Sequence, residues 1–560
     1  SPGRLLNHVY GKFLIGSLTV KIFAQLIRFG IKNVRIRSNG CTVGEEKSKT
    51  PGRGRTKPTR TSASSVGPRR GRRRIIFFHL TAMVVVLSLL VVGELVLRLC
   101  VPHPPINLND PYVSFSGLRP LFVLDSTGTR FETAEEHLTC FCPQSFAATK
   151  GPDTFRVFCL GGSTVQGRPY STETSFTTWL KLNLRAARPE TNWEVVNCGG
   201  ISYASYRLVP IMRELLKHEP DLFIIYTGHN EFLEDRTYRR LKRMPRALLR
   251  LHQVMLNLRS YSLAHRFLSG RRAQGTGDGR SSKPVLPIEV QARLDFRDGL
   301  DSYHRDDAWH QGTIEHFRHN LQKMVRMSHG AGIPIILANP VTSLKDCPPF
   351  KSEFRTDLPE RQMERVVELW EQAGKLDWGD AYGKIRLLEQ AAALDNRHAG
   401  LLYWIGKCYE HIGRSNEAKK WFVRAKEQDI CPLRILEPMH DAILDVSGRH
   451  RVPLVDVKVL IEERTEDGIP GDEWLLDHVH PSIAGHQLIA DSLYQAMEDM
   501  ELVRTPQGWR ATRDELRQRH LSSLNDAYYA HGHIRLKRLG NWSRGPILNP
   551  PPRPSDSTQD

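Results

Sequence analysis

Four short blocks of this sequence carry residue types that could carry out acyl chemistry together. They are Gly161-Gly162-Ser163-Thr164, residues 197–202, Gly228-His229-Asn230-Glu231 and residues 477–481. In chain order they supply a serine on a glycine turn, a loop of small residues, an asparagine after an apolar stretch, and an Asp-x-x-His. A serine attacks an acyl carbon only when a base takes its proton, and the resulting oxyanion needs hydrogen-bond donors. Together the blocks predict a serine hydrolase or acyltransferase.

The nucleophile and its base come from the first and last blocks. The Gly-Gly-Ser turn would expose Oγ of Ser163 where a strand passes into a helix, whose N-terminus favours negative charge. Asp477 and His480 are three residues apart and can lie on the same side of a turn. The carboxylate can then orient the imidazole and leave its other nitrogen for the serine. The two neighbouring histidines, His478 and His486, leave metal ligation as an alternative, although no Cys, Asp or Glu cluster completes such a site.

Donors for the oxyanion are expected from the two middle blocks and from the nucleophile itself. The side-chain amide of Asn230 can donate, and so can the backbone N–H groups of Ser163 and of the 197–202 loop. Taken singly, each block is explained as well by an ordinary turn. Taken jointly and in this order, they are better explained by one active site.

The order of the blocks resembles that of the SGNH hydrolase superfamily, also called the GDSL family. The resemblance covers residues 150–235 and 325–500 and implies a flavodoxin-like α/β/α sandwich. It implies that Ser163 is the nucleophile, His480 the base, Asp477 its partner and Asn230 an oxyanion donor. The first block departs from the family pattern because Gly162 stands where the family has Asp.

The second block departs further from the family. The family uses the backbone N–H of a glycine there, and Ser202 aligns with it, shortly after Gly200. A serine can supply the same N–H if its backbone angles allow. The sequence leaves open whether Ser202 or Gly200 donates.

Alternating apolar strands and helices would position these blocks. Strands are expected at 155–160, 193–197, 221–226, 333–338 and 452–457, and helices at 175–187, 205–218, 314–329 and 483–497. This alternation predicts a parallel α/β sheet. Ligand sites in such sheets form at the carboxyl ends of the strands. Ser163, Ser202 and Asn230 each come just after a predicted strand.

Two stretches interrupt the alternation within the predicted 150–500 hydrolase domain. Residues 236–307 are basic and would form a lid or a substrate-facing insertion. Residues 360–430 are helical, and small and aromatic residues between Ile405 and Ala425 have the spacing of a tetratricopeptide helix pair. With residues 381–395 as a preceding second helix, the match resembles one and a half repeats. A plain helical hairpin is the alternative, and in either case the insertion would lean on the catalytic domain and could bind a protein partner.

Positive charge is concentrated before a membrane-spanning stretch. Residues 1–74 hold 18 Lys and Arg against two Asp and Glu, whereas the whole chain has a net charge of +18. The remainder is nearly neutral, which argues against a nucleic-acid-binding domain. Residues 75–93 contain no Asp, Glu, Lys or Arg, and such a helix would span roughly 30 Å. We expect an uncleaved signal anchor at 75–101, with a cleaved signal peptide as the alternative.

The charge asymmetry also predicts orientation. The positive-inside rule keeps the basic, largely disordered tail of residues 1–74 cytoplasmic and places the enzyme outside the membrane. The expected location is therefore the cell membrane, with a single-pass anchor and an extracytoplasmic catalytic domain that is periplasmic if the cell is bacterial. Residues 545–560 are expected to be a disordered tail.

Several further residues are weaker candidates. Asn339, the segment 346–350, Glu231 and Arg236 would flank the pocket. Cys347 and Cys431 both precede proline in loops and could form a disulfide. The close pair Cys140 and Cys142 is expected to be two ordinary thiols, or one thiol and one distant disulfide, rather than a metal site. No phosphate-binding loop or dinucleotide-binding glycine motif is present, so no cofactor is predicted.

Three functions fit these observations. The first is an esterase that removes O-acyl groups, with an O-acetylated glycan or another small ester as substrate. The second is an O-acyltransferase that uses the same site, with a partner membrane protein delivering the acyl group. The third is a scaffold whose repeats bind a partner while the site is vestigial.

Overall fold

The computed structural model describes residues 69–100, 118–234, 255, 260, 288–290 and 299–543. The chain divides into two compact units, residues 1–83 and 84–560. Of the expected disordered segments, residues 1–74 and 545–560, only residues 69–74 are described, and they begin a helix. Most of the predicted lid, residues 236–307, also lies outside the described residues. The second unit holds all four chemical blocks, and the fold is described for that unit.

One long apolar helix spans the boundary between the units. Helix α2 (Arg69–Cys100) begins within the arginine tract and continues through the predicted anchor. Its 18-residue window Thr81–Arg98 has a mean hydropathy of 2.1, and no other helix among the described residues is long and apolar enough to cross a membrane. Glu94 and Arg98 are one helical turn apart and form an ion pair at 3.2 Å. Length and composition thus permit a membrane span at the predicted place.

A five-stranded parallel sheet forms the centre of the second unit. Its strands are β4 (Thr154–Gly161), β5 (Asn192–Gly199), β6 (Leu222–Tyr226), β7 (Ile335–Asn339) and β8 (Leu454–Asp456). They lie in the order β5-β4-β6-β7-β8, with every neighbouring pair parallel. This is the flavodoxin-like order, in which the first two strands are exchanged. The predicted fold class is confirmed, and all five predicted strands are present.

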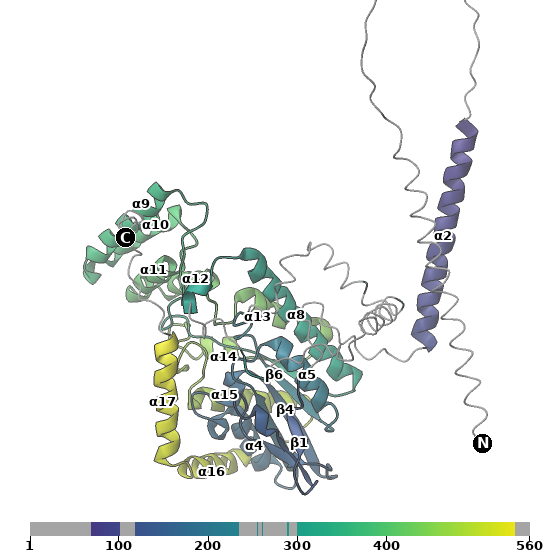
Figure 1. Ribbon diagram of the computed structural model, residues 1–560. Helices are drawn as coiled ribbons and strands as arrows, with labels where there is room; N and C mark the ends of the chain where they lie inside the picture. The colour runs from purple at the N-terminus through teal and green to yellow at the C-terminus, as the bar shows by residue number, and fades with distance from the viewer. Residues whose placement is uncertain are drawn as a thin grey trace, which may run out of the picture. The chain divides into compact units, whose positions relative to one another are not determined.

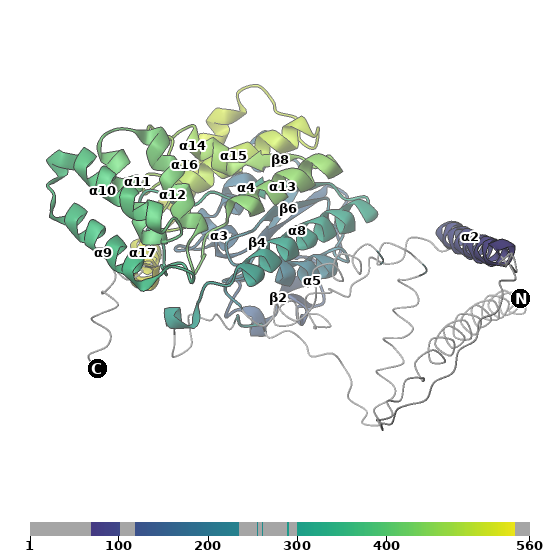
Figure 2. The same cartoon turned by 90° about the horizontal axis from the view of Figure 1, so that it is seen from above.

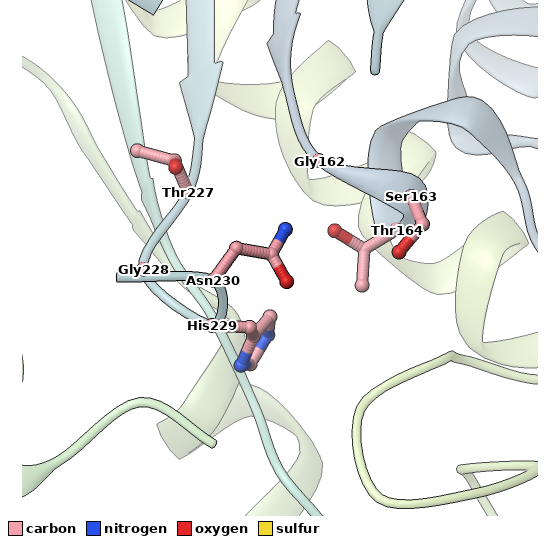
Figure 3. A pocket seen from close by; sticks show the side chains of 7 residues that line it. All are labelled: Gly162, Ser163, Thr164, Thr227, Gly228, His229 and Asn230. Atoms are coloured by element: carbon pink, nitrogen blue, oxygen red, sulfur yellow. The ribbon is translucent and has the colours of Figure 1, made fainter. Parts of the chain in front are cut away.

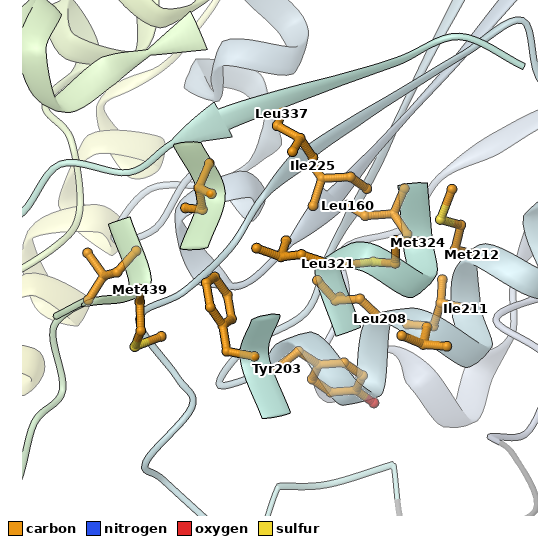
Figure 4. Close-up of a cluster of buried hydrophobic side chains, with 14 of the residues drawn as sticks. Leu160, Tyr203, Leu208, Ile211, Met212, Ile225, Leu321, Met324, Leu337 and Met439 are labelled. Carbon is orange, nitrogen blue, oxygen red and sulfur yellow. The ribbon is translucent and has the colours of Figure 1, made fainter. Parts of the chain in front are cut away.

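Helices cover both faces of the sheet (Figures 1 and 2). One face carries α4 (Phe176–Ala187), α15 (Ile483–Asp499) and α16 (Trp509–Ser522), and the other carries α5 (Ser205–Leu215), α8 (Asp307–Gly330) and α13 (Glu437–His450). Successive strand residues belong to opposite cores, because side chains alternate along a strand. Val157 and Cys159 belong to the core beneath α4 and α15. Phe158 and Leu160 belong to the core beneath α5 and α8, part of which Figure 4 shows.

The helix starts follow capping chemistry. The Ser175 side chain accepts from the Thr177 backbone N–H at the start of α4, and Ser482 caps α15 in the same way. Such caps satisfy donors that have no partner in the first helical turn. Helix α8 begins at Asp307, seven residues before the prediction, because Asp306 accepts from the Trp309 backbone N–H at 2.8 Å and extends the helix through polar residues.

The second unit contains elements that the sequence analysis did not predict. Strands β1 (Phe122–Leu124), β2 (Arg130–Thr133) and β3 (Ser145–Ala147) form a small antiparallel sheet before the central one. Helix α14 (Val457–Glu462) directly follows β8, which shortens the predicted fifth strand. Helices α16 and α17 (Asp526–Ser543) continue the chain beyond the predicted hydrolase domain.

Four helices fill the predicted insertion between β7 and β8. They are α9 (Glu360–Lys375), α10 (Ala381–Leu394), α11 (Ala399–His411) and α12 (Ser415–Glu427), and they enclose a core of their own. Because α9 pairs with α10 and α11 with α12, there are two helix pairs rather than one and a half. A Cβ on Gly406 would lie 2.7 Å from the Phe422 ring, so a glycine is what lets α11 and α12 approach this closely. The assignment to the tetratricopeptide family stays a prediction.

The insertion is joined to the rest of the unit by polar contacts, of which one set is buried and another exposed. Lys426, which is 1% exposed, donates to the carbonyl of Ile435 at 2.9 Å and to Glu437 at 2.8 Å. The Arg397 guanidinium pairs with Asp307 at 2.6 Å. These contacts agree with the expectation that the insertion leans on the catalytic domain.

Candidate active site

Strand register brings the first three blocks to one edge of the sheet. Gly161, the last residue of β4, lies opposite Gly199 of β5 and Tyr226 of β6. The chain leaves all three strands at the same level, so Ser163 and the two loops that could supply oxyanion donors begin side by side. Gly162 then caps the short helix α3 (Ser163–Gln166), which places Ser163 at its first position.

Ser163, His480 and Asp477 form a continuous hydrogen-bonded chain. His480 Nε2 lies 2.8 Å from Ser163 Oγ, and His480 Nδ1 lies 2.7 Å from Asp477 Oδ2. The side chains of His480 and Asp477 are each 4% exposed, which shields this contact from water. The structure thus brings together the three residues for which the sequence predicts catalytic roles, in the order nucleophile, base and orienting carboxylate.

Backbone contacts fix the orientation of the carboxylate. Asp477 Oδ1 accepts from the backbone N–H groups of Val479 at 2.9 Å and of His480 at 2.8 Å. Burial by itself raises the pKa of Asp477, but the neighbouring His480 and His478 and these hydrogen bonds hold that pKa below its usual range. Burial lowers the pKa of His478 to about 4, against the attraction of Asp477. Asp477 is therefore ionised and His478 is neutral near pH 7.

Backbone hydrogen bonds in the second block distinguish its two candidate oxyanion donors, the N–H groups of Gly200 and Ser202. The N–H of Gly200 donates to the carbonyl of Gly161 at 3.0 Å, and the N–H of Ile201 donates to that of Cys140 at 2.9 Å. Ser202 has a φ of +62°, in the left-handed region that non-glycine residues rarely adopt. Its N–H has no hydrogen-bond partner among the described residues. The loop thus leaves the N–H of Ser202 available and engages that of Gly200.

Asn230 extends its side-chain amide toward the turn that carries the serine (Figure 3). Its Nδ2 donates to the carbonyl of Tyr203 at 3.2 Å, which sets the direction of the amide. A Cβ on Gly162 would lie 2.5 Å from the same Nδ2, so this approach requires the glycine. A small pocket here is lined by residues 162–164 and 227–230.

The weaker candidates have structural contacts instead. Asn339 is buried and hydrogen bonds with Asp456 and His440, which ties β7 to β8 and α13. Glu231 accepts from both the backbone N–H and the hydroxyl of Ser205 at the start of α5, and burial raises its pKa. Neither supports the prediction of a pocket residue. Arg236 lies outside the described residues.

The expected chemistry of the cysteines and histidines is also corrected in part. Cys347 carries a free thiol, so the predicted pairing with Cys431 is wrong, and Cys140 and Cys142 are free thiols as well. Within the described ranges, no group of three or more His, Cys, Asp and Glu side chains is placed to hold a metal ion. His486 accepts from the Phe176 backbone N–H at 3.2 Å and thereby helps to join α15 to α4.

Sequence reasoning missed one residue that positions the site and included a second only as part of a longer segment. Gln166 donates to the carbonyls of Cys140 at 2.9 Å and of Gly199 at 3.5 Å, so it links α3 to the second block. The ring of Phe350 meets the His478 ring edge-on at 5.3 Å and packs against the base-bearing loop. Gln166 belongs to no recognisable motif, and its only sequence signal was its place three residues after Ser163, whereas Phe350 lies in the predicted segment 346–350.

Comparisons with known proteins gave structural matches only. No family model matches the chain, and no curated protein matches it by sequence. Among solved structures, it is similar to a lipase/acylhydrolase from Enterococcus faecalis (12% identity, 63% of this chain and 100% of the other, TM-score 0.28). It is also similar to a catalytic mutant of an acetylxylan esterase from Geobacillus stearothermophilus (13% identity, 64% of this chain and 100% of the other covered, TM-score 0.28). A third match is a two-domain esterase active on acetylated mannans (13% identity, 63% of this chain and 51% of the other covered, TM-score 0.26).

Likeness at these identities bears on the fold alone, and at these TM-scores it carries no argument by itself. The strand order and the placement of the blocks at the strand ends are observations on this chain. The fold is a flavodoxin-like parallel α/β sheet with helices on both faces. This sheet carries the serine after its first strand, the small-residue loop after its second, the asparagine after its third and the histidine beyond its last.

Proposed function

We propose that the protein is a serine esterase that removes O-acyl groups. The hydrogen-bonded chain from Ser163 through His480 to Asp477 is the observation that carries this proposal. With Asp477 ionised, His480 Nδ1 must donate to it, which leaves Nε2 as an acceptor for the serine proton. Ser163 Oγ then attacks the acyl carbon as its proton moves to Nε2.

The oxyanion is stabilised by three donors. They are the N–H groups of Ser163 and Ser202 and the side-chain amide of Asn230. We assign Ser202 rather than Gly200, since the N–H of Gly200 already donates to Gly161. His480 returns its proton to the leaving alcohol, an acyl-enzyme on Ser163 remains, and water activated by His480 hydrolyses it.

Helix α2 supports the cellular setting that we propose. Its apolar window and the arginine tract before it support a single membrane span with the basic end in the cytoplasm. The esterase then lies outside the membrane, where O-acetylated glycans are the substrates we propose. Protease treatment of intact and opened cells checks this, because residues 118–543 should be cleaved from outside without lysis.

Hydrolysis of p-nitrophenyl acetate by the purified full chain in detergent tests the chemistry. We expect kcat to fall by about 10³-fold or more in both Ser163→Ala and His480→Ala, because each removes a member of the same proton-transfer unit. Combining the two substitutions should cost little beyond either one. Ser328→Ala, on α8 and away from the site, is the matched serine control and should retain activity.

A second measurement separates hydrolysis from transfer. If wild type does not hydrolyse the ester, a fluorophosphonate shows whether Ser163 is activated at all. An activated serine is labelled and requires an acceptor other than water, whereas a serine that is not activated is not labelled. Labelling of wild type but not of His480→Ala would then turn the proposal toward acyl transfer. Failure of wild type to label would exclude both reactions.

A further inference from the structure

Two arginines lie at the loop that follows the nucleophile helix. Arg168 is five residues after Ser163, and its backbone N–H donates to the carbonyl of Ser163 at 3.1 Å. Arg535 comes from α17, far away in sequence, and donates to the carbonyl of Tyr170 at 2.6 Å. Among the described residues, neither guanidinium forms an ion pair with Asp or Glu.

Helix α17 is held firmly in this position. The hydroxyl of Tyr528 lies 2.8 Å from the hydroxyl of Thr174 and accepts from the Ser171 backbone N–H at 3.3 Å. A Cβ on Gly532 would lie 2.1 Å from the Tyr170 ring, so the helix and the loop after the nucleophile are in close contact. The packing of α17 therefore fixes Arg535 at the loop that follows the nucleophile helix.

The position of Arg168 connects the nucleophile turn to the oxyanion loop. Its Nε donates to Gln166 Oε1 at 2.9 Å, and the Gln166 amide donates to the carbonyls of Cys140 and Gly199. Gly199 opens the loop that leads to Ser202. A group bound by Arg168 would therefore be held at the loop that directly follows the nucleophile helix.

Most of the hydrogen-bonding capacity of these arginines is unused. An arginine has five N–H donors in a planar fork, and each of these two donates from its side chain to one described partner. Neither has a fully buried nitrogen without a partner, so the remaining donors face accessible space. Burial lowers the pKa of Arg168 and the charge of Arg535 lowers it further, while only the thiols of Cys142 and Cys140 act in the other direction.

Two like charges held near each other, one of them partly desolvated, are costly unless an anion compensates them. Arginine forks match the two oxygens of a carboxylate or a phosphate. We propose that Arg168 and Arg535 form an anion-binding subsite, so that the esterase selects esters on molecules that also carry a carboxylate or phosphate group. This assignment of substrate class depends on the proposed esterase function.

A matched set of small esters tests the subsite on the full chain in detergent. The probes are 4-acetoxybenzoate, its methyl ester and 4-acetoxyphenyl phosphate, which carry the same acetyl ester beside a carboxylate, a neutral group and a phosphate. We expect kcat/KM for at least one anionic ester to exceed that for the neutral one by about tenfold or more, with the gap shrinking at high salt. The preferred anion tells which chemistry the natural substrate offers.

Variants decide whether the two arginines are responsible. In Arg535→Gln, the ratio of kcat/KM for the anionic ester to kcat/KM for the neutral ester should fall close to one, while kcat/KM for the neutral ester stays within about threefold of wild type. In Arg168→Gln, the same ratio should fall close to one. Lys537→Gln removes the same charge from an exposed position on α17 and should keep the preference. No preference in wild type, or one that survives both substitutions, would overturn the subsite.

A binding measurement keeps the two proposals apart. If no ester is hydrolysed, the esterase proposal fails, and the subsite is judged by calorimetric titration of Ser163→Ala with oligogalacturonate and with neutral xylo-oligosaccharide. Binding of the acidic oligomer that weakens by about tenfold in each arginine variant would support the subsite without catalysis. Equal binding of both oligomers would refute it.

Discussion

At the scale of single residues, the site depends on one glycine that has no chemistry of its own. Gly162 separates the strand from Ser163, and the Asn230 amide lies where its side chain would begin. Any side chain at position 162 would meet this amide, so the close contact depends on the glycine. We infer that Gly162 sets the distance between the nucleophile and its asparagine donor.

Adding a single methyl group at Gly162 should therefore impair catalysis. In Gly162→Ala the new Cβ would lie 2.5 Å from Asn230 Nδ2 and must displace the amide. We expect kcat toward p-nitrophenyl acetate to fall by about 10²- to 10³-fold, the usual cost of losing one oxyanion donor. Gly330→Ala, where a Cβ meets nothing within 4 Å, should leave kcat unchanged. Wild-type kcat in Gly162→Ala would show that Asn230 is not a donor.

The sequence predicted residue types well and individual contacts poorly. Ser163, Asp477 and His480 could be chosen because their chemistry and spacing are restrictive. The choice between Ser202 and Gly200 could not be made, because the bond from Gly200 to Gly161 exists only once β4 and β5 pair in parallel. Asn339 and Glu231 were misread because a polar residue after a strand can serve packing as well as substrate.

At the scale of elements, close helix packing makes the insertion sensitive to small changes. Gly406 on α11 faces the Phe422 ring of α12, whereas Gly374 on α9 faces open space. Both glycines are helical, so replacement by alanine favours the helix by about 0.5–1 kcal/mol in each case. Only at Gly406 does a steric clash oppose this gain.

The two alanine variants should shift stability in opposite directions. We expect Gly406→Ala to lower the melting temperature, since its Cβ would lie 2.7 Å from the Phe422 ring, and Gly374→Ala to raise it slightly. Adding Phe422→Leu to Gly406→Ala should recover part of the loss by making room. Differential scanning calorimetry measures all three, and a neutral Gly406→Ala would mean that the helix pair can separate at little cost.

Elements with a strong periodic pattern were predicted, and elements with a weak one were missed. The five central strands are short apolar runs bounded by polar residues, so their pattern is distinctive. Strand β2 alternates between exposed and half-buried residues without one fully buried position, so it offered no such signal. Helix α17 was missed for a related reason: it packs on Tyr170 through Gly532 and Tyr528 instead of a continuous apolar face.

At the scale of the whole molecule, buried histidines set the response to acid. Burial lowers the pKa of His310, His398 and His478 to about 4 and that of His486 to about 3. In the unfolded chain each of these histidines would have a pKa near 6.5. Between pH 6.5 and pH 4 the unfolded chain therefore binds more protons than the folded one. Stability is therefore complete above pH 6.5 and is lost as the pH falls toward 4. Asp429 opposes this, because burial raises its pKa to about 6.

His398 allows one of these contributions to be isolated. It caps α11 by accepting from the Leu401 backbone N–H at 3.3 Å, and asparagine can cap a helix without titrating. Between pH 7.5 and 5.0 we expect wild type to lose about 2 kcal/mol more of unfolding free energy than His398→Asn. Urea unfolding followed by tryptophan fluorescence measures this, with the exposed His531→Asn as control. Equal losses in all three proteins would contradict a neutral His398.

The distance along the chain between nucleophile and base also has a consequence for biosynthesis. Ser163 and His480 are 317 residues apart, so at about 5–20 residues per second the ribosome adds the histidine roughly 15–60 s after the serine. Strands β4, β5 and β6 can already pair during that interval, and the helical insertion is made within it. A chain still in synthesis therefore carries an inert serine, and its reactivity begins only after His480 has been made and has reached the sheet.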